Sequence, residues 1–125
     1  MIKIKRGMDI PIQGSPQQII EGAPAARAVA LVGFDYVGMK PTMAVAEGDR
    51  VKLGQLLFSD KKTEGVLYTA PASGVVAAIN RGARRVLQSV VIEIDGDEAE
   101  SFSSHSAESI SGLDPAAVRE QLIQS

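Results

Sequence analysis

Three arginines fall within five residues of the sequence, at Arg81, Arg84 and Arg85, around Gly82 and Ala83. A guanidinium group presents a planar fork of hydrogen-bond donors, which suits carboxylates and phosphates. No aromatic residues are interleaved with these arginines, so the pattern does not indicate nucleic-acid binding. We therefore predict that this loop contacts a protein partner, and a solvated turn remains the open alternative.

The other side chains that could do chemistry form no catalytic or metal-binding pattern. His105 is the single histidine, and nothing in its serine-rich, acidic surroundings indicates a triad. The carboxylates at 95, 97, 98 and 100 lack the spacing of a calcium-binding loop. The chain has no cysteine and no glycine-rich phosphate-binding motif. We expect no catalytic residue and no metal site in this chain, and the sequence assigns no cofactor-binding residue.

The net charge of −2 over 125 residues conceals two parts of opposite sign. Residues 1–90 carry 12 basic and 7 acidic side chains, whereas residues 91–125 carry 1 basic and 8 acidic side chains. A basic body can face an acidic partner, phosphates or lipid head groups, or it can simply be solvated. The sequence contains no apolar run of bilayer length and no secretory signal after its basic opening, so we expect a soluble or peripheral protein.

The elements that must position these residues are short β-strands separated by turns. Runs of strand length occur at 29–32, 42–45, 56–58, 66–69, 75–79 and 86–94. Glycine and proline interrupt the pattern, notably at 63–65 and 70–74. About seven closely spaced strands predict a mainly β fold, a small barrel or sandwich.

A weak internal repeat supports this interpretation. Residues 45–58 can be laid over residues 79–92, so that Gly48 meets Gly82 and an apolar triplet closes each block. Two copies of one strand–turn–strand unit would give a pair of sheets related by a pseudo-twofold axis. A chance match is the alternative, because glycine followed by apolar residues is common in β proteins.

The turn signals resemble those of biotinyl and lipoyl carrier domains. The matching segments are Gly48-Asp49-x-Val51-x-x-Gly54-Gln55 and Ala70-Pro71-x-x-Gly74-x-Val76. The resemblance implies a barrel-sandwich hybrid, in which carriers hold a modified lysine at a hairpin tip. Lys61 and Lys62 fall in the corresponding hairpin, but turn chemistry places its tip at 63–65. A covalently attached group on either lysine is therefore the less favoured interpretation, and solvated lysines at a strand end are favoured.

The end of the chain differs from the β region. Residues 95–113 are polar and acidic and predict an exposed linker. Asp114 and Pro115 then provide an N-cap and a first-turn proline for a short C-terminal helix over 114–125. Val118, Leu122 and Ile123 supply its apolar face. No glycine or basic last turn ends this helix. We therefore expect it to lead into a further domain, and we divide the chain into a β module (1–94), a linker (95–113) and the start of a helix (114–125).

A closer resemblance runs through almost all of residues 1–94. Its segments are Met1 to Gly14, Tyr36-Val-Gly-Met-Lys-Pro41, residues 47–55, Asp60-Lys-Lys62, Thr69-Ala-Pro-Ala-Ser-Gly74 and residues 79–91. Together these segments resemble the N-terminal part of the A subunit of the Na+-translocating NADH:quinone reductases. The C subunit of the Rnf-type complexes has a similar module, but the opening segment favours the sodium pump.

The resemblance implies a peripheral subunit on the cytoplasmic side of the bacterial inner membrane, in a complex that couples NADH oxidation and quinone reduction to sodium export. It implies that ubiquinone is associated with the whole subunit, while NADH, flavins and iron–sulfur clusters belong to other subunits. On this basis we expect a scaffold or docking module without catalysis of its own, whose partners are the other subunits. A lipoyl or biotinyl carrier and a membrane-fusion-type adaptor remain the alternatives.

Overall fold

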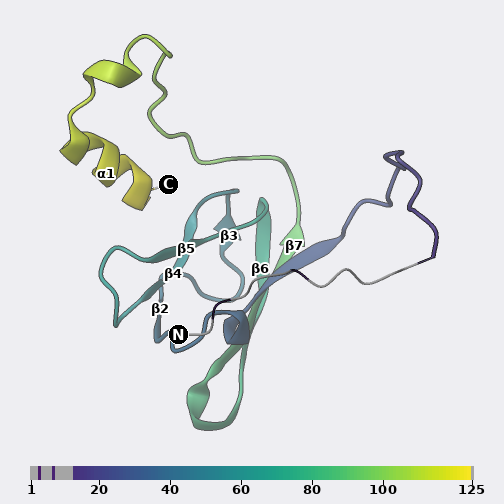
Figure 1. The fold of residues 1–125 in the computed structure, drawn as a ribbon. Helices are drawn as coiled ribbons and strands as arrows, with labels where there is room; N and C mark the ends of the chain where they lie inside the picture. Colours follow the sequence, from purple (N-terminus) through teal and green to yellow (C-terminus); the bar gives the residue numbers. More distant parts are fainter. Residues whose placement is uncertain (1–2, 4–6, 8–12, 125) are drawn as a thin grey trace.

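The computed structural model describes residues 3, 7 and 13–124, and seven β-strands form within this part of the chain. They build two antiparallel sheets that share one core (Figure 1). One sheet has the order β1-β7-β6-β3, formed by Ala28–Val32, Leu87–Ile94, Gly74–Arg81 and Arg50–Val51. The other has the order β2-β4-β5, formed by Pro41–Met43, Leu56–Asp60 and Leu67–Thr69. The mainly β fold predicted from the sequence is confirmed.

The strand positions follow the apolar runs closely, with two differences. The run at 42–45 forms a strand only as far as Met43, and no apolar run indicates the two-residue strand β3. The longest strands, β6 and β7, pair as a hairpin from Gly74 opposite Ile94 to Arg81 opposite Leu87. This hairpin extends beyond the body of the molecule (Figure 1), and its tip carries the three arginines.

The core is aliphatic apart from one phenylalanine. Its buried members come from both sheets and the 70–74 turn: Val51, Leu57, Phe58, Ala70, Val76, Leu87, Val90 and Ile92. Phe58 stacks on Tyr68 with ring centres 4.7 Å apart, and Tyr36 lies 4.5 Å from Tyr68. Aromatic pairs at these separations stabilise a fold beyond the area they bury. The cluster anchors the segment after β1 to the second sheet.

The start of β6 requires glycine for a steric reason. A Cβ atom at Gly74 would lie 1.9 Å from the carbonyl oxygen of Glu93 on the paired strand β7. No real Cβ approaches a backbone atom so closely, so a larger residue would force β6 and β7 apart. Gly48, in the turn before β3, has a φ of +90° and donates its N–H to the carbonyl of Val76 at 2.8 Å. Glycine adopts this left-handed conformation without steric cost.

The two blocks of the sequence repeat do not fold alike. Residues 45–58 contribute β3 to one sheet and β4 to the other, whereas residues 79–92 form the tip of a single hairpin in one sheet. The aligned glycines also differ, because φ is +90° at Gly48 and −94° at Gly82. The prediction of two like strand–turn–strand units is therefore wrong, and the shared glycine positions reflect turn chemistry common to β proteins.

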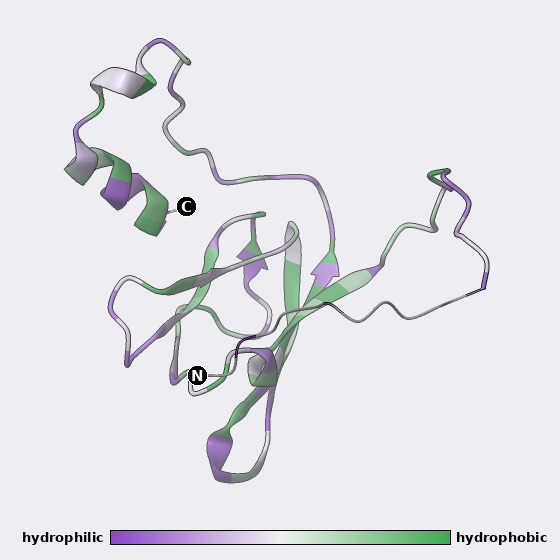
Figure 2. Ribbon diagram, viewed as in Figure 1, coloured by the Kyte–Doolittle hydropathy of each residue, from purple (hydrophilic) through white to green (hydrophobic). Residues whose placement is uncertain are grey.

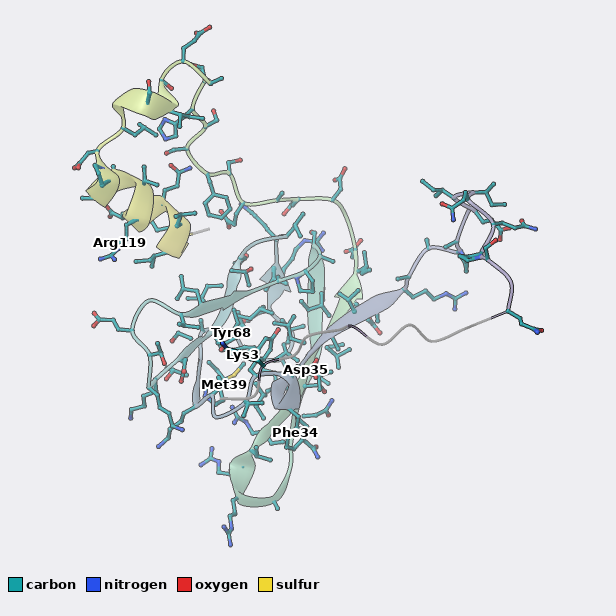
Figure 3. All side chains as sticks on the ribbon, in the orientation of Figure 1. Lys3, Phe34, Asp35, Met39, Tyr68 and Arg119 are labelled. Atoms are coloured by element: carbon teal, nitrogen blue, oxygen red, sulfur yellow. The ribbon has the colours of Figure 1, made fainter. Side chains whose placement is uncertain are left out.

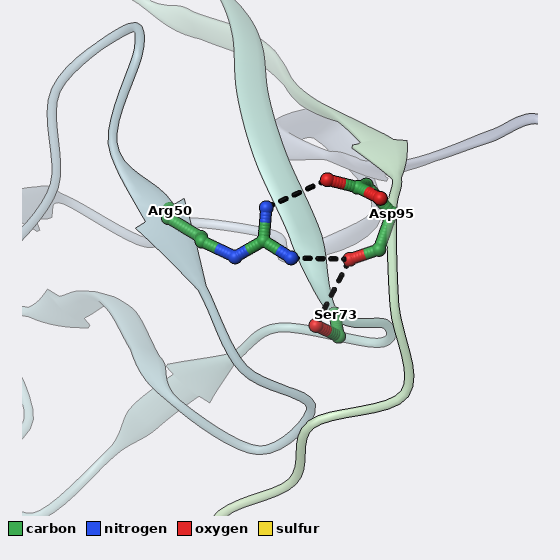
Figure 4. A network of polar contacts seen from close by, with 3 residues as sticks. All are labelled: Arg50, Ser73 and Asp95. Atoms are coloured by element: carbon green, nitrogen blue, oxygen red, sulfur yellow. Dashed lines mark hydrogen bonds and ion pairs between the residues drawn. The ribbon is translucent and has the colours of Figure 1, made fainter.

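The first residues of the acidic segment that follows β7 are hydrogen-bonded to the β module. Arg50 on β3 donates to the Asp95 carboxylate at 2.6 Å and to the Asp95 carbonyl at 3.1 Å, and Ser73 also donates to that carbonyl (Figure 4). Further along, the N–H of Leu53 donates to the carbonyl of Glu98, and the N–H of Glu100 donates to the carbonyl of Leu53. The first residues of the expected linker thus lie against the module.

Helix α1 covers Pro115–Gln124 and has no buried side chain. The Asp114 carboxylate accepts the N–H of Ala116 at 3.3 Å, so the predicted N-cap and the C-terminal helix are confirmed. All three residues of the expected apolar face, Val118, Leu122 and Ile123, are exposed, although the Ile123 side chain also lies beside Gly65 of the β4–β5 hairpin. The helix therefore touches the β module lightly instead of completing its core.

None of the helices in the described residues has the length and hydrophobicity needed to cross a bilayer. Most of the opening segment, which carries part of the resemblance to the sodium pump and the basic N-terminus, lies outside the described residues. The division of the chain at residues 94 and 113 stays a prediction.

Candidate functional site

The three arginines lie at the tip of the β6–β7 hairpin, the hydrophilic end of two largely hydrophobic strands (Figure 2). A short 3-10 turn, η2 (Ala83–Arg85), closes the hairpin, with the N–H of Gly82 donating to the carbonyl of Val86 at 2.9 Å. Arg81 donates from Nη1 to the carbonyl of Arg85 at 3.2 Å. These bonds hold the arginines in one tight turn.

Arg84 and Arg85 both adopt the left-handed backbone conformation, with φ of 56° and 61°. This region is uncommon for residues other than glycine and costs roughly 1–2 kcal/mol per residue. Strain of this kind concentrates at functional sites, where another requirement outweighs stability. At this hairpin tip, charged side chains occupy two positions where glycine would be the relaxed choice.

A cleft of about 370 Å³ separates the hairpin tip from the segment that leads into β2. Charged walls and an apolar floor line it: Gly33, Met39, Lys40, Pro41, Arg81, Arg84, Arg85, Val86 and Leu87. The structure therefore brings the three predicted arginines together on one cleft and adds Lys40 to them. Sequence reasoning missed Lys40, because some 40 residues separate it from the arginines and no local pattern links them.

A second hollow of about 480 Å³ adjoins this cleft. The two share Gly33, Met39 and Val86, and the second is completed by Phe34, Tyr36, Val37, Gly38 and Lys62. We call the two hollows together the basic groove. Phe34 lies on the short turn η1 (Gly33–Asp35), where the hairpin leaves the body, and Met39 lies beside it (Figure 3).

Gly33 sets the width of the groove. A Cβ atom at this position would lie 2.2 Å from the carbonyl oxygen of Leu87, so only glycine allows η1 to lie against the start of β7. The residue that follows, Phe34, is held at the rim of the groove in consequence. Because η1 packs this closely on β7, the Phe34 side chain lies near the base of the β6–β7 hairpin.

Asp60 at the end of β4 holds the opposite wall. Its Oδ1 atom accepts the backbone N–H groups of Lys40 and Lys62, each at 3.0 Å. These two hydrogen bonds hold the pKa of the Asp60 carboxyl below its ordinary value, because they stabilise the ionised form. The N–H of Lys61 also donates to the carbonyl of Lys40 at 2.8 Å, so the Lys40 side chain leaves from a fixed backbone.

The electrostatics of the groove are one-sided. Five cations line it, namely Lys40, Lys62, Arg81, Arg84 and Arg85, and no carboxylate of the described residues does. Two acids neighbour the lining residues in the sequence, Asp35 on η1 and Asp60, whose carboxylate is occupied by backbone donors. In the part of the chain that the structure describes, the single ion pair is Arg50–Asp95, away from this groove. The arrangement can bind carboxylates or phosphates, and its lining contains no acid–base or nucleophile–base pair.

Comparison with known proteins decides the family. Residues 2–95 match the model of the NqrA N-terminal barrel-sandwich hybrid domain. The chain belongs to the NqrA N-terminal family. The predicted barrel-sandwich hybrid and the resemblance stated from the sequence are thereby confirmed.

Curated relatives of this family member share most of its sequence. The chain is 65% identical over all 125 residues to the A subunit of the Na(+)-translocating NADH-quinone reductase of Saccharophagus degradans. It is 62% identical over its whole length to the corresponding subunit of Pseudomonas aeruginosa, and 60% identical to that of Klebsiella pneumoniae. In each case the chain spans 28% of the relative's length. It therefore corresponds to the N-terminal part of a longer subunit.

Lys61 and Lys62, the two lysines considered as possible carrier residues, lie in the β4–β5 hairpin of this NqrA-type domain. Lys61 and Lys62 follow directly after β4, and the turn of the hairpin is closed by the N–H of Val66 donating to the carbonyl of Thr63 at 3.3 Å. The N–H of Asp60 donates to the carbonyl of Val66 at 3.1 Å, so the loop of the hairpin spans residues 61–65 and includes both lysines as well as the predicted turn at 63–65. Lys62 Nζ donates to the carbonyl of Gly38 at 2.6 Å, so this lysine spans two loops of the groove wall.

His105 takes part in a different hollow of the NqrA-type chain. The ring nitrogen Nε2 lies 3.0 Å from Oε1 of Gln121 on α1, and the amide of Gln121 also donates to the carbonyl of Ser103. Among the described residues, no three histidine, aspartate or glutamate side chains are grouped so that they could hold a metal ion. Through its hydrogen bond with Gln121, His105 links the polar segment 95–113 to helix α1.

Proposed function

We propose that this chain is the N-terminal docking module of the A subunit in a Na+-translocating NADH-quinone reductase. The observation that carries the proposal is the basic groove, in which five cations and exposed apolar side chains meet without catalytic groups beside them. Family membership supplies the context, because the relatives are named as subunits of such a complex. The module would contribute binding energy to assembly and leave the redox chemistry to the rest of the complex.

In this proposal the complex oxidises NADH, reduces a quinone and moves sodium, as the names of the relatives state. We place the module at the cytoplasmic face of the bacterial membrane, held there through its partner subunits. The 125 residues contain no cysteine, so they provide no thiolate ligand for an iron–sulfur cluster. Ubiquinone would associate with the whole subunit, and flavins would belong to other subunits.

The division of labour along the chain forms part of the proposal. Residues 1–94 would form the docking module, residues 95–113 the linker and residues 114–125 the start of a helix leading into the remainder of the subunit. The length of the relatives supports this order, because the chain aligns with only 28% of them. The light contact between α1 and the β module also supports it, since a helix with exposed Val118 and Leu122 has an apolar face left for a further domain.

The carrier alternative has less support than docking. Lys61 and Lys62 lie in the loop of the β4–β5 hairpin, but Lys62 Nζ is engaged by the Gly38 carbonyl. A carrier lysine must instead project freely to reach several active sites. Intact mass spectrometry of the native subunit separates the two functions, since a lipoyl or biotinyl adduct on either lysine would favour the carrier.

The proposal is tested by purifying the complex. The full-length subunit that carries this chain is tagged and isolated from membranes, and sodium-stimulated NADH–quinone reductase activity is assayed. We expect activity to co-purify with the tagged subunit and to be lost when residues 1–94 are deleted. Recovery of the tagged protein alone and inactive would refute the assignment to the sodium pump.

A further inference from the structure

The basic groove is too large for a small inorganic anion. Its two hollows have volumes of about 370 and 480 Å³. A cavity needs only roughly 10–15 Å³ of this kind of volume to admit one water, so each hollow holds many waters. A single phosphate or carboxylate would leave most of this space to solvent. The dimensions suit several linked groups, as in an extended stretch of peptide.

The chemistry of the groove is also mixed. Beside the cations, Phe34, Val37 and Val86 are 64%, 97% and 43% exposed. A face that is merely solvated needs no such concentration of exposed apolar side chains. A ligand that satisfies both sets of groups must carry carboxylates together with at least one large apolar side chain.

The concave shape distinguishes a peptide from a membrane surface. Met39 and Leu87 lie on the floor of the groove, and Leu87 is almost fully buried. A flat bilayer would reach the rim at Phe34 and Val37 but not this floor. A peptide side chain can enter it, in the way that anchor residues fill pockets at protein interfaces.

The chain's own acidic segment is tied at the other end of the hairpin. Asp95 follows the last residue of β7 and is held by Arg50, whereas the arginines lie at the opposite end of the same strands. Seven residue steps along β7 at ~3.3 Å each put roughly 23 Å between these ends. Glu98 and Glu100 are bonded through their backbones to Leu53. The acidic residues at 95–100 therefore do not occupy the groove, and the proposed docking function points to a partner subunit as the source of the occupant.

We propose that the basic groove binds an acidic, extended peptide segment of a partner subunit, with one large apolar side chain of that segment seated between Phe34 and Val86. Carboxylates of the segment pair with Lys40 and with the arginines of the hairpin tip. This inference rests on the proposed docking function, and it specifies the partner's chemistry at that site.

A peptide-binding titration on the 125-residue chain tests the inference without the rest of the complex. The probe is a fluorescein-labelled synthetic peptide of sequence EEFEELEE, followed by fluorescence anisotropy at low and physiological salt. We expect saturable, salt-weakened binding, and at least a tenfold loss of affinity in the variant Arg84→Gly/Arg85→Gly. Glycine suits both backbone positions, so this variant keeps its fold. Its thermal midpoint should not fall, which separates lost binding from lost structure.

Two controls make the outcome specific. The matched variant Lys52→Gln/Arg119→Gln also removes two positive charges, but at positions outside the groove. It should change the affinity less than twofold. The peptide EESEESEE keeps the acidic residues but lacks the apolar anchors, and it should bind several-fold more weakly. Equal losses in both double variants, or equal binding of both peptides, would show non-specific charge attraction and overturn the inference.

Further arms identify other occupants. Binding of phosphatidylglycerol vesicles without peptide binding would assign the surface to a membrane and overturn the inference. Self-association through a second copy, detected by sedimentation and abolished in the arginine variant, would do the same. A failure to bind peptide while reductase activity co-purifies with the full subunit would reject this inference and leave the proposed function standing.

Discussion

At the scale of single residues, the backbone of Arg84 and Arg85 supports the proposal that the hairpin tip serves binding. Both have left-handed backbones without being glycine, and both line the basic groove. A loop shaped only for stability would place glycine or asparagine there. The conformation therefore indicates that charge at this tip is kept at a cost in folding free energy.

The first prediction follows from that cost. Replacing both arginines with glycine should raise the free energy of unfolding by about 1–2 kcal/mol. Relief of the left-handed strain gains about 1–2 kcal/mol per residue, and the larger backbone entropy that each glycine loses on folding offsets about 0.5–1 kcal/mol of it. Thermal unfolding followed by circular dichroism measures the change. The alanine pair Arg84→Ala/Arg85→Ala removes the same charges but keeps the Cβ atoms, and it should give no gain. Equal stability of the two pairs would contradict the strain interpretation.

Asp60 makes a second prediction, on pH. Its folded pKa is lowered by the N–H groups of Lys40 and Lys62, so its stabilisation is fully present above its unfolded pKa of about 3.9. That stabilisation is lost as the pH falls through the lower, folded pKa. The difference in thermal midpoint between wild type and Asp60→Asn should therefore be constant from pH 8 to about pH 5 and shrink below about pH 4. A difference that persists unchanged at the lowest pH would contradict the assigned hydrogen bonds.

At the scale of secondary structure elements, the groove depends on the approach of η1 to β7. Gly33→Ala would place a methyl group against the Leu87 carbonyl, where only 2.2 Å is available. Overpacking of this kind typically costs about 1–3 kcal/mol, and chemical denaturation should show a loss in that range. Gly22→Ala is the matched control, since nothing lies within 4 Å of that position, and it should be neutral. Neutral behaviour at both positions would mean that η1 does not pack on β7 as described.

The elements themselves could largely be predicted from the sequence. Apolar runs bounded by glycine and proline located six of the strands, and Asp114-Pro115 located the start of helix α1. These features depend on neighbouring residues, so local patterns carry them. The repeat was predicted wrongly because it too is a local pattern. Gly48 and Gly82 look alike in sequence but belong to different connections in the fold.

The groove could be predicted only in part. The arginine cluster is local and could be seen in the sequence. Lys40 precedes β2, which belongs to the other sheet, and it meets the arginines only through the packing of the two sheets. Likewise, Phe34 and Val37 belong to an apolar stretch of the sequence, and nothing local shows that they stay exposed. Contacts between distant segments follow from sheet pairing, which a single sequence specifies weakly.

At the scale of the whole molecule, charge is separated along the β6–β7 hairpin. The arginines occupy its tip, and the acidic residues from Asp95 onward leave from its other end. A molecule with such a charge distribution is steered toward a partner in one orientation, with the basic end leading. The overall acidic balance of the chain therefore conceals a basic end, which is the end that we propose for docking.

The most direct test of the docking account is assembly of the whole complex with the charge of the hairpin tip reversed. The full-length A subunit carrying Arg84→Glu/Arg85→Glu would be expressed in place of the native protein. The amounts of the other subunits that co-purify with it from membranes would then be quantified against Lys52→Glu/Arg119→Glu as control. The account predicts at least a tenfold loss of co-purifying subunits for the hairpin variant, with the control close to wild type. Undiminished assembly of a correctly folded hairpin variant would contradict it.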